Sequence, residues 1–175
     1  MTVGDLIDGL GGIDILVNVV ACPTRDEVLL EGQTATWERV VEDEVVDLIE
    51  TTQGVVPHMR QQKAGRIINI VPSLPARQST HVVTSATTRA VIGGITQALA
   101  KELMGHGITV NAVVCSIAIQ HGTSTERGDD LPGRNRGAAP KDAAVIAAFL
   151  ASAAAGYITG EMWLVDGGQR LLEGP

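Results

Sequence analysis

Aromatic residues are almost missing from this sequence. One Tyr, one Phe and two Trp make up 2% of the 175 residues. Hydrophobic residues nevertheless reach 45%, so the chain can form one domain with a core of Val, Ile, Leu and Ala. Cysteine is also scarce, and the spacing of Cys22 and Cys115 fits neither a metal site nor a disulfide framework. We therefore expect two free thiols and no metal ion.

Long apolar runs and basic clusters are absent as well. No stretch approaches the roughly 18 consecutive apolar residues of a membrane-spanning helix. The N-terminal segment MTVGDLIDGLGG lacks the basic residues of a signal peptide. A net charge of −7 without a basic cluster argues against binding to nucleic acid or to an anionic membrane. The sequence thus predicts a cytoplasmic protein that binds neither.

What is present is an alternation of apolar runs and helical patterns. The predicted strands are residues 13–20, 65–71, 108–115 and a closing segment within 157–168. The predicted helices are residues 2–11, 36–62, from Thr84 or Ser85 to about 103, and 141–154. Short, continuous β-branched runs such as 65–71 are typical of parallel strands that are buried on both faces.

Helix boundaries and faces can also be predicted. A Thr or Ser hydroxyl can cap the start of the long helices, and Gly105 and Gly107 end the third one. The expected core face of the last helix is Val145, Ile146, Phe149 and Leu150. Residues 120–140 are polar and rich in Gly, Asp and Arg, which is typical of a mobile loop.

Several segments resemble the short-chain dehydrogenase/reductase family. Residues 65–94 resemble its catalytic strand, turn and helix, IDILVNVVA resembles its Asp-Ile-Leu-Val-Asn-Asn-Ala-Gly, and ITVNAVVC resembles its Val-Asn-x-Val-x-Pro-Gly strand. Residues 37–59 follow its Trp-x-x-Val helix, and YITGEMWLVDGG resembles its closing strand and Val-Asp-Gly-Gly turn. The resemblance covers about residues 5–170. It implies an α/β, Rossmann-like domain over 1–175, with three αβα layers, a parallel sheet and 120–140 as a lid-like loop.

The residues that carry catalysis in that family are replaced here. The resemblance places Glu44 at the position of its Asn, Thr84 at its Tyr and Thr88 at its Lys; its Ser falls on Val71 or Pro72, one residue before Ser73. A threonine hydroxyl has too high a pKa and too short a reach to replace the tyrosine, and proline has neither a hydroxyl nor an amide donor. We therefore expect no family-type hydride transfer by this chain alone.

The second difference from the family is the lack of its Gly-rich cofactor-binding turn. No Gly-x-x-x-Gly-x-Gly occurs, and Gly11-Gly12 precedes a predicted strand, whereas the phosphate-binding turn follows one. The family pattern places that turn in strand-helix units upstream of the matched segments. We therefore expect a domain without those units, with no bound NAD or NADP and with residues 13–20 as an exposed apolar edge.

Three functions are compatible with this pattern. The first is a non-catalytic structural or regulatory subunit that associates with a full-length short-chain reductase or with itself. The second is a cofactor-independent lyase, isomerase or cyclase, whose candidate residues are Glu44, Asp47, Ser73, Thr84 and His81. The third is a truncated NAD(P)-dependent reductase of the 3-oxoacyl type, or a decaying gene product. The plainer interpretation of the acidic residues is a water-facing helix surface formed by Glu42, Asp43, Glu44, Asp47 and Glu50.

Overall fold

A parallel sheet forms the centre of the molecule. The computed structural model describes residues 3–20, 34–35, 38, 41–72, 83–115 and 140–168. Within these residues the strands are β1 (Ile15–Val19), β2 (Gly65–Pro72), β3 (Ile108–Cys115) and β4 (Met162–Val165). They pair in the order β1-β2-β3-β4, and each pair is parallel.

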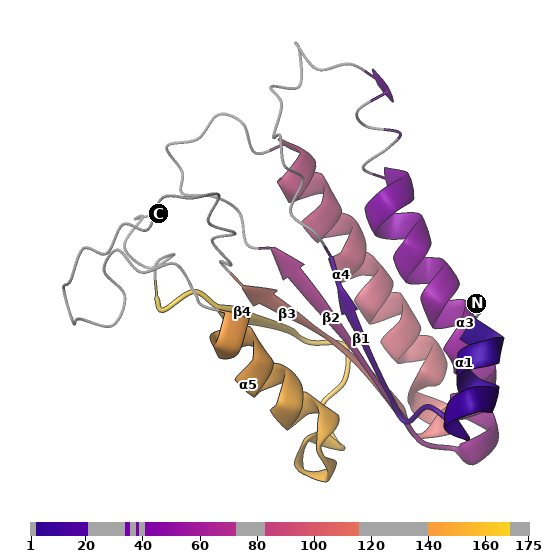
Figure 1. Cartoon of the computed structure of the whole chain (residues 1–175). Coiled ribbons are helices and arrows are strands. Elements are labelled where there is room, and N and C mark those ends of the chain that lie inside the picture. Colours follow the sequence, from indigo (N-terminus) through magenta and orange to yellow (C-terminus); the bar gives the residue numbers. More distant parts are fainter. Residues whose placement is uncertain are drawn as a thin grey trace.

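Helices cover both faces of this sheet (Figure 1). The α-helices are α1 (Val3–Leu10), α3 (Asp47–Gln62), α4 (Val83–Leu103) and α5 (Pro140–Ala151). A π-helical segment, η1 (Val41–Val46), precedes α3, and the 3-10 helices η2 (Met104–His106) and η3 (Ala153–Ala155) follow α4 and α5. Helices α3 and α4 pack on one face and α5 on the other, while α1 lies against α3. This confirms the predicted three-layer α/β fold.

The strand β3 is buried along its whole length, as its apolar sequence predicts. Successive side chains of the strand point to opposite faces of the sheet. Val110 packs with α3 and α4, whereas Val113 packs with α5. The central strands therefore have no solvent side, which explains why they contain continuous β-branched runs in place of an apolar and polar alternation.

The end of α4 follows the glycine signals. The helix ends at Leu103, and Gly107 adopts a left-handed conformation with φ of 71° after η2. A side chain there would collide with the backbone carbonyl of Lys63. Gly107 is therefore required both by its backbone angle and by the close approach of the neighbouring turn.

The core face of α5 agrees with the prediction at Ile146 and Leu150 and differs from it at Val145 and Phe149. Ala143, Ala147 and Leu150 are the buried residues, and Ile146 packs beside them. Val145 is 67% exposed and Phe149 is 38% exposed. The helix turns its small residues toward β2 and β3, so the two larger side chains lie outside the contact.

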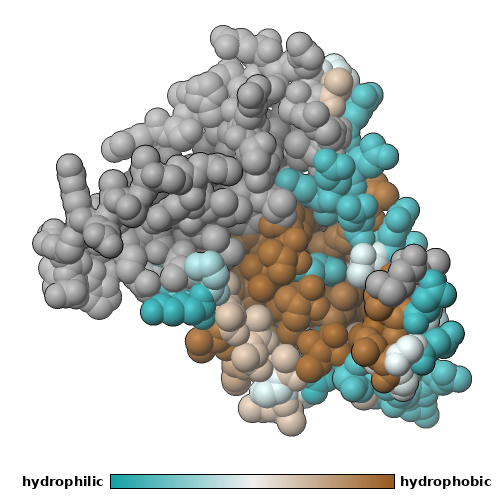
Figure 2. Space-filling model, viewed as in Figure 1, coloured by the Kyte–Doolittle hydropathy of each residue, from teal (hydrophilic) through white to brown (hydrophobic). Residues whose placement is uncertain are grey.

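The apolar sequence of residues 13–20, like that of 65–71, predicts a buried strand, and for β1 this prediction is wrong. Its residues alternate between exposed and half-buried. The reason is that β1 is the edge of the described sheet and is covered on one face only, which agrees with the apolar edge that was also expected at residues 13–20. Ile15, Val17 and Val19 lie exposed on the open face, and Figure 2 shows apolar side chains gathered between α5 and α1.

Several predictions fall wholly or partly outside the described residues. These include the lid-like loop, which is described only at Pro140, the cap at Thr36, and Cys22. The single domain over residues 1–175 also stays a prediction. No helix in the described parts of the chain is both long and apolar enough to cross a membrane. Cytoplasmic location stays a prediction.

Candidate functional site

The candidate site lies where the carboxyl ends of β1, β2 and β3 meet. In parallel α/β sheets this edge is where ligands bind. Below it, Val20, Leu48, Val71, Ile92 and Ala112 form an apolar cluster. The segment η1 packs against α4 at this end of the sheet. Glu44 lies on η1 and Thr88 lies on α4. The contact between η1 and α4 therefore brings together the two segments that carry these residues.

Glu44 departs from the expected water-facing surface. It is only 7% exposed, whereas Glu42, Asp43, Asp47 and Glu50 are exposed. It precedes the buried Leu48 and Thr52 at four-residue spacing and so shares their inward-facing side of the helical segment. Glu44 is therefore a buried carboxylate, and Asp47 is a surface residue whose carbonyl accepts the Thr51 hydroxyl at 2.8 Å.

The structure describes the other predicted site residues to different extents. Thr88 is 2% exposed and lies in the interior of α4. Pro72 is the last residue of β2 and is in register with Cys115 of β3. Thr84 lies in the first turn of α4, but its side chain is outside the described part of the structure, and Ser73 and His81 are wholly outside it.

A buried network of polar side chains lies on the side of the sheet that faces α3 and α4. The Asn18 side-chain amide donates to Asn69 Oδ1 at 2.9 Å and to Thr52 Oγ1 at 3.4 Å. The Asn69 amide in turn donates to Thr96 Oγ1 at 3.0 Å. These bonds tie β1 and β2 to α3 and α4. Asn18 belongs to the segment IDILVNVVA that resembles the family, but its partners Thr52 and Asn69 are distant in the sequence and were not predicted.

Cys115 ends β3 at the same edge. It is a buried free thiol. Burial raises the pKa of the Cys115 thiol above its ordinary value, and the nearby Asp142 carboxylate raises it further, against a smaller lowering by a backbone hydrogen bond from Ala143. The thiol therefore stays protonated at neutral pH and is a poor nucleophile.

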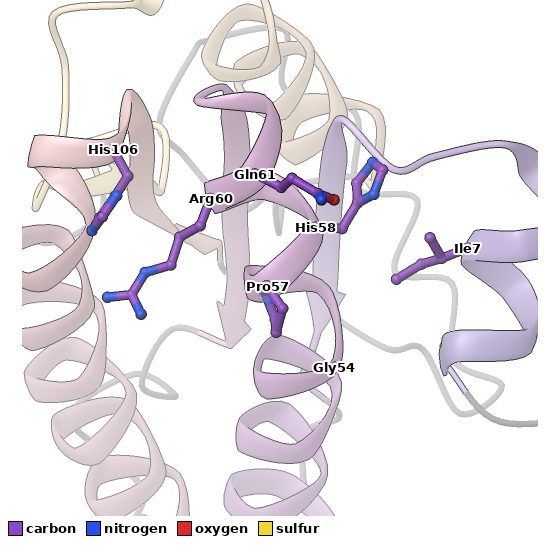
Figure 3. Close-up of a pocket in the computed structure, with 7 residues that line it drawn as sticks. All are labelled: Ile7, Gly54, Pro57, His58, Arg60, Gln61 and His106. Atoms are coloured by element: carbon purple, nitrogen blue, oxygen red, sulfur yellow. The ribbon is translucent and has the colours of Figure 1, made fainter.

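A hollow lies at the C-terminal end of α3, away from the candidate site. Its volume is about 630 Å³. Seven residues line it: Ile7, Gly54, Pro57, His58, Arg60, Gln61 and His106. Arg60 points away from His58 toward α4 (Figure 3), where it binds Glu102 at 3.2 Å. The hollow is an open surface depression, and we assign it no chemistry.

Comparison with known proteins identifies the family. A family profile described as enoyl-(acyl carrier protein) reductase matches residues 1–170. The 3-oxoacyl-[acyl-carrier-protein] reductase FabG of Staphylococcus epidermidis is 32% identical over 171 residues, which are 94% of this chain and 69% of that reductase. The chain belongs to the short-chain dehydrogenase/reductase family. The short-chain reductase protein NovJ of Streptomyces niveus is also 32% identical, over 95% of this chain and 68% of NovJ.

Solved structures of short-chain dehydrogenases and reductases agree with this assignment. Acetoin dehydrogenase from Enterobacter cloacae superposes with a TM-score of 0.83 at 26% identity, over 99% of this chain and 70% of that protein. YwfH, an NADPH dependent reductase involved in bacilysin biosynthesis, gives a TM-score of 0.82 at 25% identity, over 94% of this chain and 69% of YwfH.

These relatives correct one prediction. The sequence was interpreted as having no cofactor, but its relatives are reductases and dehydrogenases, one of them NADPH dependent. Such enzymes need a hydride donor or acceptor, so the family points to NAD or NADP. Among the described residues at the candidate site, Glu44 and Thr88 carry no positive charge that could pair with the phosphates of such a cofactor.

Proposed function

We propose that this chain is a structural or regulatory subunit of a short-chain oxidoreductase assembly, in which a full-length member of the family performs the hydride transfer. The observation that carries the proposal is the pair Glu44 and Thr88. Both are buried at the site edge, where the family pattern has an amide and an ammonium group. A carboxylate and a short hydroxyl cannot supply the same charge and donors.

The relatives suggest which oxidoreductase the subunit would assist. Curated relatives include 3-oxoacyl-[acyl-carrier-protein] reductases from several bacteria. We therefore propose that the partner reduces a 3-oxoacyl thioester with a nicotinamide cofactor. Helices α3 and α4 and the unit of α5 and β4 provide surfaces through which two chains of this fold can associate.

Native mass spectrometry tests the association. The chain is measured alone and after co-expression with the full-length short-chain reductase of its own organism, with and without NADPH. We expect a mixed oligomer, and a change of at least about twofold in the kcat/KM of the reductase. An unmixed homo-oligomer together with unchanged kinetics of the reductase would rule out the proposed role as a subunit.

Activity of the chain by itself is the second test. We expect no NADPH oxidation with a 3-oxoacyl thioester by this chain alone. Turnover by the isolated chain that is lost in the Thr88→Ala variant would contradict the proposal and would favour a reductase in its own right.

The burial of Glu44 favours one other candidate function, a cofactor-independent lyase, isomerase or cyclase. Glu44 would be the general base, since Asp47 is exposed to water. A general base works best with a pKa near the working pH. NMR titration of the Glu44 carboxyl carbon measures this directly. A midpoint near pH 4 would exclude this second function.

A further inference from the structure

We draw no further inference here: the strongest candidate, the open hollow at the C-terminal end of α3 with His58, Arg60 and His106 in its lining, carries none because Arg60 already binds Glu102 and nothing in the described part of the structure shows which ligand would occupy it.

Discussion

The side-chain amide of Asn18 donates to Asn69 Oδ1 at 2.9 Å, and the two residues are direct register partners on β1 and β2. Asn69 is fully buried, and its side-chain amide donates to Thr96 Oγ1. A shift of β1 by one residue would break the bond and move Asn18 from the covered face of the strand to the open one. The pair therefore helps to fix the register of the edge strand β1.

Replacing Asn69 should be costly. Asn69→Leu leaves the Asn18 amide without its 2.9 Å acceptor and removes the donor to Thr96. We expect a loss of about 2–4 kcal/mol of unfolding free energy in urea denaturation. The control is Thr51→Ala, which removes an exposed hydroxyl bond to Asp47 and should change stability by less than about 0.5 kcal/mol. Equal effects of the two substitutions would show that the network is not stabilising.

Gly107 should not tolerate a side chain. Its φ of 71° is unfavourable for other residues, and an added Cβ would meet the Lys63 carbonyl. We expect Gly107→Ala to lower the thermal midpoint clearly, at a cost of about 2 kcal/mol or more. Gly105→Ala is the matched control, since a Cβ added at Gly105 would meet no atom within 4 Å. It should be neutral or slightly stabilising, and a similar loss in both variants would contradict the steric argument.

Cys115 should be unreactive and should make stability depend on alkaline pH. Burial raises the pKa of its thiol, as does Asp142, so the folded-state pKa lies above the unfolded one. The contribution is fully present below the unfolded pKa, about 8.5, and is lost as the pH rises toward the folded pKa. In a Cys22→Ser background, unfolding free energy should fall above that pH, and the further Cys115→Ala change should remove the fall. The folded thiol should also react with a disulfide reagent at least about tenfold more slowly than the unfolded chain at pH 8. Rapid labelling without unfolding would contradict this.

The two sides of α5 should respond differently to charge. Ala147 is 8% exposed against β2 and β3, so Ala147→Lys should destabilise the fold by about 2–4 kcal/mol. Val145 is 67% exposed, and Val145→Lys should change stability by less than about 0.5 kcal/mol. Chemical denaturation of the two variants distinguishes the observed face from the one that hydrophobicity alone predicts. A larger loss of stability in Val145→Lys than in Ala147→Lys would support the core face that was predicted from the sequence.

Strand positions and much of the site were accessible from sequence. Residues 108–115 form β3 as predicted, because a β-branched run bounded by polar residues has few alternatives to a buried parallel strand. Gly107 marked the end of α4, because its left-handed backbone favours glycine. The positions of Glu44, Pro72 and Thr88 on neighbouring elements at the carboxyl edge followed from the family resemblance.

Burial was decided by tertiary structure. Hydrophobicity favoured Val145 over Ala147, but Ala147 lies on the side of α5 that packs on the sheet and Val145 does not. Glu44 shares one side of its helical segment with Leu48 and Thr52, while its acidic neighbours stay exposed. The packing of η1 against α4 decided that this side is buried.

The sequence by itself determined the elements of this protein, their order and their family, because these depend on local patterns of apolar, glycine and capping residues. Only the tertiary structure decided that β1 is covered on one face and open on the other, at Ile15, Val17 and Val19. The physical reason is that burial depends on which layers pack on a strand, and those layers come from residues that are distant in the sequence.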